Sequence, residues 1–114
     1  MMQDWNAYRD SLMSRVGDYA ALSPDVVRGL QVMERNHAKS GALDGKTREL
    51  ISLAVAVTTR CDGCIAVHSK AAVESGATRE EIADALGVAI ALNAGAALTY
   101  SARALDALAA LPKT

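Results

Sequence analysis

The sequence predicts an all-α fold, a compact domain of about six helices. Three observations favour this fold. Period-two alternation of β-branched residues is scarce, whereas apolar residues recur at the three- and four-residue spacing of a helix. The 114 residues include 23 alanines and no phenylalanine, and such small side chains let helix backbones approach closely. Residues that start and stop helices also recur along the chain.

The first two helices are bounded by residues that typically start and stop helices. A helix over about 3–16 is followed by Gly17. The Ser-Pro-Asp sequence at 23–25 then supplies an N-cap, a proline at the first helical position and an acid in the first turn. We expect this second helix to run to about residue 39, where Gly41 and the serine before it end it.

The third helix is predicted to begin at the N-cap Asp44. Leu50, Leu53 and Val57 then form one apolar stripe at helical spacing. The segment 51–57 would also suit a buried strand, but the capped start and the lack of a partner strand favour a helix. The two threonines at 58–59 are expected to interrupt it, because β-branched polar residues fit a helix interior poorly.

The remaining helices follow the same logic. A fourth helix is predicted from near Cys61 to Gly76, and Thr78 with Glu81 forms a capping box that starts a fifth. The Asn-Ala-Gly sequence at 93–95 predicts a break or a kink, with a last helix over about 96–110.

Length and composition limit the classes of function. We expect residues 1–114 to form a single domain. Net charge is −1 without a basic block, which argues against a nucleic-acid or anionic-membrane surface. The N-terminus does not resemble a secretory signal, and the apolar run 86–98 is judged too short and too interrupted to span a bilayer. These observations predict a cytoplasmic protein. The small core, together with the segment 86–98 that is apolar nearly all round, predicts a homo-oligomer, and a tight monomer with a central helix is the alternative.

Both cysteines and one of the two histidines lie in the stretch RCDGCIAVH at 60–68. On a helix, Cys61, Cys64 and His68 fall within an arc of roughly 60°. Cys64 and His68 are direct neighbours at i and i+4. A helix N-terminus favours a thiolate, an imidazole can accept its proton, and a second thiol can close a disulfide. In a reducing compartment, such a pair is more typical of redox or metal chemistry than of a structural disulfide.

Glu49 is the fourth candidate residue. If the third and fourth helices fold against each other, its carboxylate can reach His68 and fix the tautomer of the imidazole. The arrangement of Glu49, then Cys61-x-x-Cys64, then His68 resembles the signature of the AhpD-like alkylhydroperoxidases of the carboxymuconolactone decarboxylase superfamily. The surrounding segment 46–86 is similar to that family as well.

The resemblance implies a thiol peroxidase or disulfide oxidoreductase that needs no cofactor. Cys64 would attack an organic hydroperoxide, Cys61 would resolve the product as a disulfide, and Glu49 with His68 would relay the proton. A dithiol reductant or redox partner protein would then reduce the disulfide, in a homo-oligomer such as a trimer or hexamer. Some family members carry a second histidine between the cysteines, where this chain has Gly63. Proximity of the base to Cys64 independently favours Cys64 over Cys61 as the nucleophile.

Three alternatives remain open at this stage. Cys61, Cys64 and His68 could bind zinc with His37 or Asp62 as a fourth ligand. The cysteines could instead be apolar core residues of an inactive relative. A lyase of the decarboxylase type is the third alternative, although decarboxylases of this superfamily typically lack the cysteine pair. For His37, a favourable interaction with the C-terminal end of the second helix is the simpler interpretation.

Overall fold

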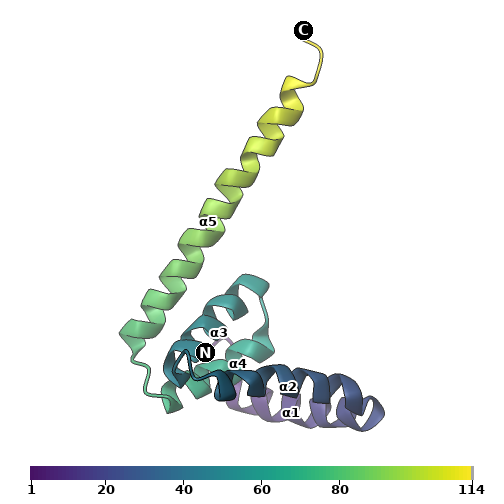
Figure 1. Ribbon diagram of the computed structural model, residues 1–114, viewed down its shortest axis with the longest axis vertical. Helices are drawn as coiled ribbons and strands as arrows, with labels where there is room; N and C mark the ends of the chain where they lie inside the picture. The colour runs from purple at the N-terminus through teal and green to yellow at the C-terminus, as the bar shows by residue number, and fades with distance from the viewer. Residues whose placement is uncertain (114) are drawn as a thin grey trace.

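The computed structural model describes residues 1–113, without the side chains of residues 37–40. Within this part of the chain there are five helices and no strand, so the all-α prediction is confirmed with five helices instead of about six (Figure 1). The helices are α1 (Trp5–Leu22), α2 (Pro24–Ser40), α3 (Gly45–Thr59), α4 (Asp62–Glu74) and α5 (Arg79–Ala109). The helical interpretation of segment 51–57 is also confirmed.

Two predicted helix breaks are wrong. Helix α1 continues through Gly17 to Leu22, because one exposed glycine costs a helix only about 1 kcal/mol. Helix α5 continues through the segment 93–95 for 31 residues. The Asn93 amide donates hydrogen bonds to the Ala89 carbonyl at 2.7 Å and to the Thr58 hydroxyl at 2.9 Å. Its polar group is therefore satisfied without any departure from helical geometry.

The predicted N-caps begin their helices, although they differ in detail. Asp44 accepts a hydrogen bond from the Thr47 N–H at 2.8 Å, and Thr78 forms the full capping box with Glu81. Ser23 occupies the N-cap position of α2 but makes no side-chain cap hydrogen bond. The hydroxyl groups of the threonines at 58–59 bond back to carbonyls one turn earlier, so these residues form the last turn of α3.

An ion pair joins the starts of α3 and α5. Lys46 Nζ lies 2.8 Å from Glu81 Oε2. The hydrogen bond from Lys46 lowers the pKa of the Glu81 carboxyl, and the same bond raises the pKa of the Lys46 ammonium. Both side chains are partly exposed, so the pair fixes the approach of the two helices more than it stabilises the fold.

Helix α3 lies at the centre of the packing. It contacts α4 and α5, while α1 contacts α4 and α2. Within the described residues only five hydrophobic side chains are buried: Leu53, Ala56, Ala66, Ala72 and Ala89. Four of them are alanines, which bury little apolar area, so the core of a single chain is small.

Helix α5 extends away from the other helices. Figure 1 shows its C-terminal half rising alone beyond the cluster formed by α1–α4, and the molecule is 60 Å long. By length and composition α5 is sufficient to cross a membrane, which corrects the expectation that its apolar run is too short and too interrupted. Those two properties alone do not assign a membrane span, because core helices of soluble proteins share them.

Candidate active site

The turn between α3 and α4 places the thiol pair. Helix α3 ends at Thr59, and Arg60 then adopts a left-handed conformation with φ 54° and ψ 50°. The main-chain N–H groups of Arg60 and Cys61 both donate to the Ala56 carbonyl, the second at 3.0 Å. This tight reversal lets α4 begin at Asp62 and fold back along α3.

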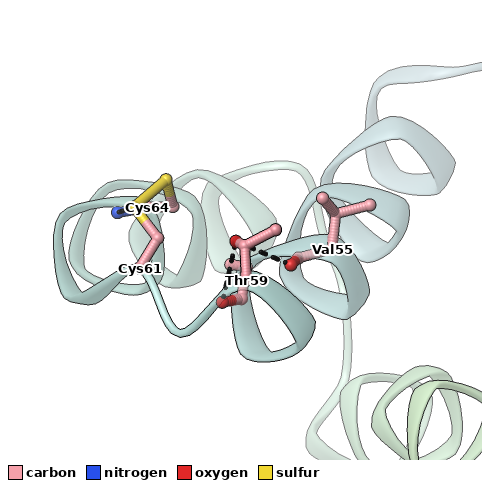
Figure 2. The surroundings of a disulfide bond; sticks show 5 residues. Val55, Thr59, Cys61 and Cys64 are labelled. Atoms are coloured by element: carbon pink, nitrogen blue, oxygen red, sulfur yellow. Dashed lines mark hydrogen bonds between the residues drawn. A yellow bond between two sulfur atoms is a disulfide. The ribbon is translucent and has the colours of Figure 1, made fainter. Parts of the chain in front are cut away.

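Cys61 and Cys64 form a disulfide at the start of α4, with their Cα atoms 5.2 Å apart. Cys61 is the N-cap of α4, so it lies just before the helix and not within it as predicted. Its sulfur accepts a hydrogen bond from the Cys64 N–H at 3.1 Å. Figure 2 shows the disulfide at this helix start, with Thr59 on the last turn of α3. A free main-chain N–H at a helix N-terminus favours negative charge on the sulfur that it contacts.

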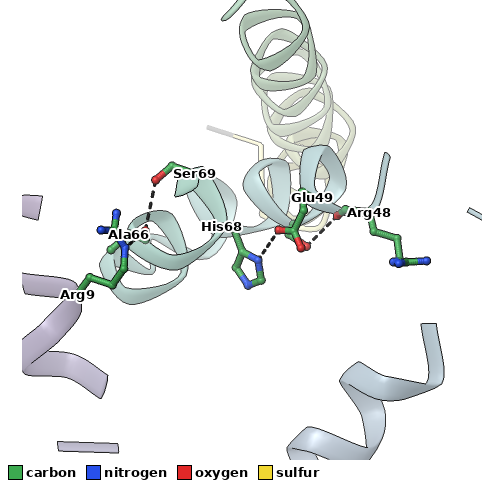
Figure 3. Close-up of polar contacts among 7 residues, drawn as sticks. Arg9, Arg48, Glu49, Ala66, His68 and Ser69 are labelled. Atoms are coloured by element: carbon green, nitrogen blue, oxygen red, sulfur yellow. Dashed lines mark hydrogen bonds and ion pairs between the residues drawn. The ribbon is translucent and has the colours of Figure 1, made fainter. Parts of the chain in front are cut away.

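Helices α3 and α4 fold against each other, and Glu49 meets His68 as expected for that packing. His68 Nδ1 lies 2.7 Å from Glu49 Oε2, and Figure 3 shows the imidazole pointing from α4 towards the carboxylate on α3. The two side chains are 31% and 22% exposed, so the pair is shielded but reachable. A carboxylate at Nδ1 fixes the tautomer and leaves Nε2 to exchange a proton. His68 lies one helical turn after Cys64, on the same side of α4.

Most of the chain is similar to one known protein family. The sequence profile described as "Carboxymuconolactone decarboxylase family" matches residues 24–107, well over half of the chain. The chain belongs to the carboxymuconolactone decarboxylase family. This family includes enzymes, decarboxylases and alkylhydroperoxidases among them, and the resemblance to its AhpD-like members is supported.

Similar proteins agree with this assignment. A carboxymuconolactone decarboxylase family protein from Legionella pneumophila, crystallised in its apo form, has a TM-score of 0.73 and 36% identity. That match covers 90% of this chain and 92% of the other. An uncharacterized protein from Haemophilus influenzae is 48% identical over 94% of this chain and 95% of its own. "Uncharacterized protein 4 in cox locus" from Paracoccus denitrificans is 47% identical over 60% of this chain and 61% of its own.

Helix α1 precedes the region that the family profile matches, yet it packs directly behind the thiol pair. Arg9 Nε donates to the Ala66 carbonyl of α4 at 2.6 Å, as Figure 3 shows. A Cβ atom at Gly63 would lie 2.7 Å from Leu12 Cδ2. In this family member, α1 therefore occupies the space beside Gly63, one of the two residues between the cysteines. Sequence reasoning missed both contacts, because they join residues about fifty positions apart.

The zinc alternative requires Cys61, Cys64 and His68 to be grouped with a fourth ligand. Within the described residues, no group of three or more His, Cys, Asp and Glu side chains is arranged to hold a metal ion. Asp62 is exposed in the first turn of α4, and the side chain of His37 lies outside the described part of the chain.

Proposed function

We propose that this protein is a thiol peroxidase, a disulfide oxidoreductase that reduces organic hydroperoxides through the Cys61–Cys64 disulfide. The observation that supports this proposal is the pairing of two features on one short helix. A disulfide forms at the first turn of α4, and the His68–Glu49 pair lies one turn further on. A nucleophile, a resolving thiol and an oriented base are the groups that a thiol peroxidase needs.

The oxidative half of the cycle begins with proton transfer. His68 accepts the Cys64 proton through Nε2 while Glu49 stabilises the imidazolium that forms. The Cys64 thiolate attacks the terminal oxygen of the hydroperoxide, and the O–O bond breaks. The alkoxide takes the proton back from His68 and leaves as an alcohol, while Cys64 becomes a sulfenic acid. Cys61 then displaces the hydroxyl group, which releases water and forms the disulfide.

The contact at Cys61 suits a resolving thiol. The Cys61 sulfur accepts a hydrogen bond from the Cys64 N–H, and this bond stabilises Cys61 as a thiolate. The thiolate is the form that attacks the sulfenic acid and the form that leaves on reduction. Reduction requires an external dithiol, which donates two electrons and becomes a disulfide itself. Under this proposal no metal or organic cofactor takes part.

Mass spectrometry provides the direct test of the cycle. Fully reduced protein treated with one equivalent of cumene hydroperoxide should lose about 2 Da, as Cys61 and Cys64 form a disulfide. The hydroperoxide should be converted to its alcohol in equal amount. Protein that keeps its reduced mass, or gains oxygen at methionine only, would refute the peroxidase proposal.

We further propose that a second copy of this chain covers the exposed apolar face of α3 and α5, in a cytoplasmic homo-oligomer such as a trimer or hexamer. Between these helices lies a groove of about 430 Å³ with almost entirely apolar walls, to which Ile51, Val55, Val88 and Leu92 contribute. Each of these side chains is about half exposed or more. A monomer rarely leaves such a contiguous surface uncovered.

Leu92→Asp is expected to dissociate the oligomer, because it places a charge in the apolar groove. Light scattering after size exclusion should show wild-type protein as a multimer and the variant as a smaller species. Val73→Asp is the matched control, since Val73 on α4 is 64% exposed and Leu92 is 66% exposed. A monomeric wild-type protein, or a Leu92→Asp variant of unchanged size, would contradict this interface.

A further inference from the structure

Arg60 adopts a backbone conformation that the chain elsewhere gives to glycine. It is the one non-glycine residue with positive φ among the described residues. Gly41 and Gly76, which follow the ends of α2 and α4, have φ of 64° and 89°. The left-handed region suits glycine because it has no Cβ atom to clash with the backbone. An arginine here, immediately before Cys61, therefore strains the turn that positions the disulfide.

Nothing within the fold explains the arginine side chain. Its guanidinium is exposed and makes no hydrogen bond or ion pair with any residue that the structure describes. Its main-chain N–H donates to the Ala56 carbonyl, which glycine would do equally well. What arginine adds at this position is a positive charge beside the thiol pair. Residues held in unfavourable backbone conformations concentrate at functional sites, where the surrounding structure keeps them in place.

Two charged residues of opposite sign flank Cys61 in the sequence. Arg60 precedes it, and the exposed Asp62 follows it in the first turn of α4. Glu49 and His68 also lie at the site, where they pair with each other. A reductant that approaches the disulfide therefore meets the electric fields of two exposed charges of opposite sign, Arg60 and Asp62.

We propose that Arg60 is a selectivity residue, which attracts reductants that carry an anionic group to the Cys61–Cys64 disulfide. This inference rests on the proposed redox function. The thiolate of a dithiol attacks the Cys64 sulfur, the Cys61–Cys64 bond breaks, and Cys61 leaves as a thiolate. The second thiol of the reductant then attacks the mixed disulfide and releases Cys64. Two electrons pass from the dithiol to the protein, and the reductant departs as a disulfide.

Three small thiols of similar size but different charge test this proposal. Oxidised full-length protein is reduced with 3-mercaptopropionate (anionic), 2-mercaptoethanol (neutral) or 2-aminoethanethiol (cationic) at low ionic strength. For each variant, the rate constant for reduction by the anionic thiol is divided by the rate constant for the cationic thiol. This ratio is then divided by the wild-type ratio, which cancels the intrinsic reactivities of the thiols. Arg60→Gly should lower this ratio about fourfold, because one unit charge about 10 Å away in water changes each of the two rate constants about twofold, in opposite directions.

Matched variants separate charge from structure. Arg60→Lys should keep the wild-type ratio, and Asp62→Asn should raise it. Arg103→Gln removes an equal charge from the C-terminal half of α5, the part of the helix that extends away from α1–α4 in Figure 1, and should leave the ratio unchanged. The effect of Arg60→Gly should vanish at about 1 M salt, where charges are screened within a few ångströms.

Stability and reactivity should change independently in Arg60→Gly. Because glycine relieves the left-handed strain, the melting temperature of the variant should equal or exceed that of wild type. An Arg60→Gly ratio equal to wild type, or a loss that Arg60→Lys shows equally, would overturn the inference. No hydroperoxide enters this experiment, so a failure of the peroxidase proposal leaves its result interpretable.

Discussion

Replacing Cys64 with serine is expected to abolish hydroperoxide turnover, lowering the steady-state rate by about a thousandfold or more. A serine hydroxyl stays protonated at neutral pH and attacks peroxide oxygen poorly, so no intermediate forms for Cys61 to resolve. Consumption of cumene hydroperoxide with excess dithiothreitol would measure the effect. Because the native Cys61–Cys64 disulfide closes only a short loop, the variant should keep its helical circular dichroism spectrum.

The matched variant Cys61→Ser separates the roles of the two thiols. It should consume one equivalent of hydroperoxide and stop at a Cys64 sulfenic acid, which dimedone traps and mass spectrometry detects. The assignment of Cys61 as the nucleophile is also chemically reasonable, because Cys61 is the N-cap of α4 and its sulfur accepts a hydrogen bond from the Cys64 N–H. If Cys64→Ser gives the trapped sulfenic acid and Cys61→Ser does not, then Cys61 is the nucleophile and the assignment here is wrong.

Local sequence signals predicted most of the fold. Asp44 and Thr78 begin helices because their side chains satisfy main-chain N–H groups only three residues away. The two wrong breaks have a common cause, since glycine and asparagine were interpreted from local preference alone. Asn93 stays helical because its side-chain amide donates a hydrogen bond to the Thr58 hydroxyl on α3. That partner is 35 residues away in the sequence. Such tertiary contacts are not visible in the spacing of one segment.

The candidate site divides in the same way. The contact between Glu49 and His68 depends on two adjacent helices joined by a tight turn, so the spacing predicts it only on the condition that these helices fold against each other. The support from Arg9 and Leu12 on α1 was missed, because no pattern within α4 shows which helix packs behind it. The left-handed conformation of Arg60 was also missed, since an arginine gives no signal for a backbone that usually selects glycine.

His68→Gln is expected to lower the rate of Cys64 oxidation about a hundredfold at pH 7. An ordinary cysteine thiol ionises near pH ~8.5, so without a neighbouring base only a few per cent would be thiolate at that pH. The alkoxide leaving group would also lose its proton donor, and general acid–base catalysis typically contributes 10²- to 10⁴-fold. Stopped-flow measurement of the first turnover would isolate this step from reduction by the dithiol.

The pH dependence distinguishes loss of a base from loss of structure. The rate of His68→Gln should rise steadily as pH approaches about 9, because hydroxide replaces the missing base and ionises the thiol directly. Glu49→Gln should cause a smaller loss, about tenfold, since the amide oxygen can still accept a hydrogen bond from Nδ1–H but carries no negative charge. Glu74→Gln removes an exposed carboxylate from α4, the helix that carries His68, and should have no effect. A His68→Gln variant with the wild-type rate at pH 7 would exclude the imidazole from proton transfer, and the Cys64 thiol would then require another activating group.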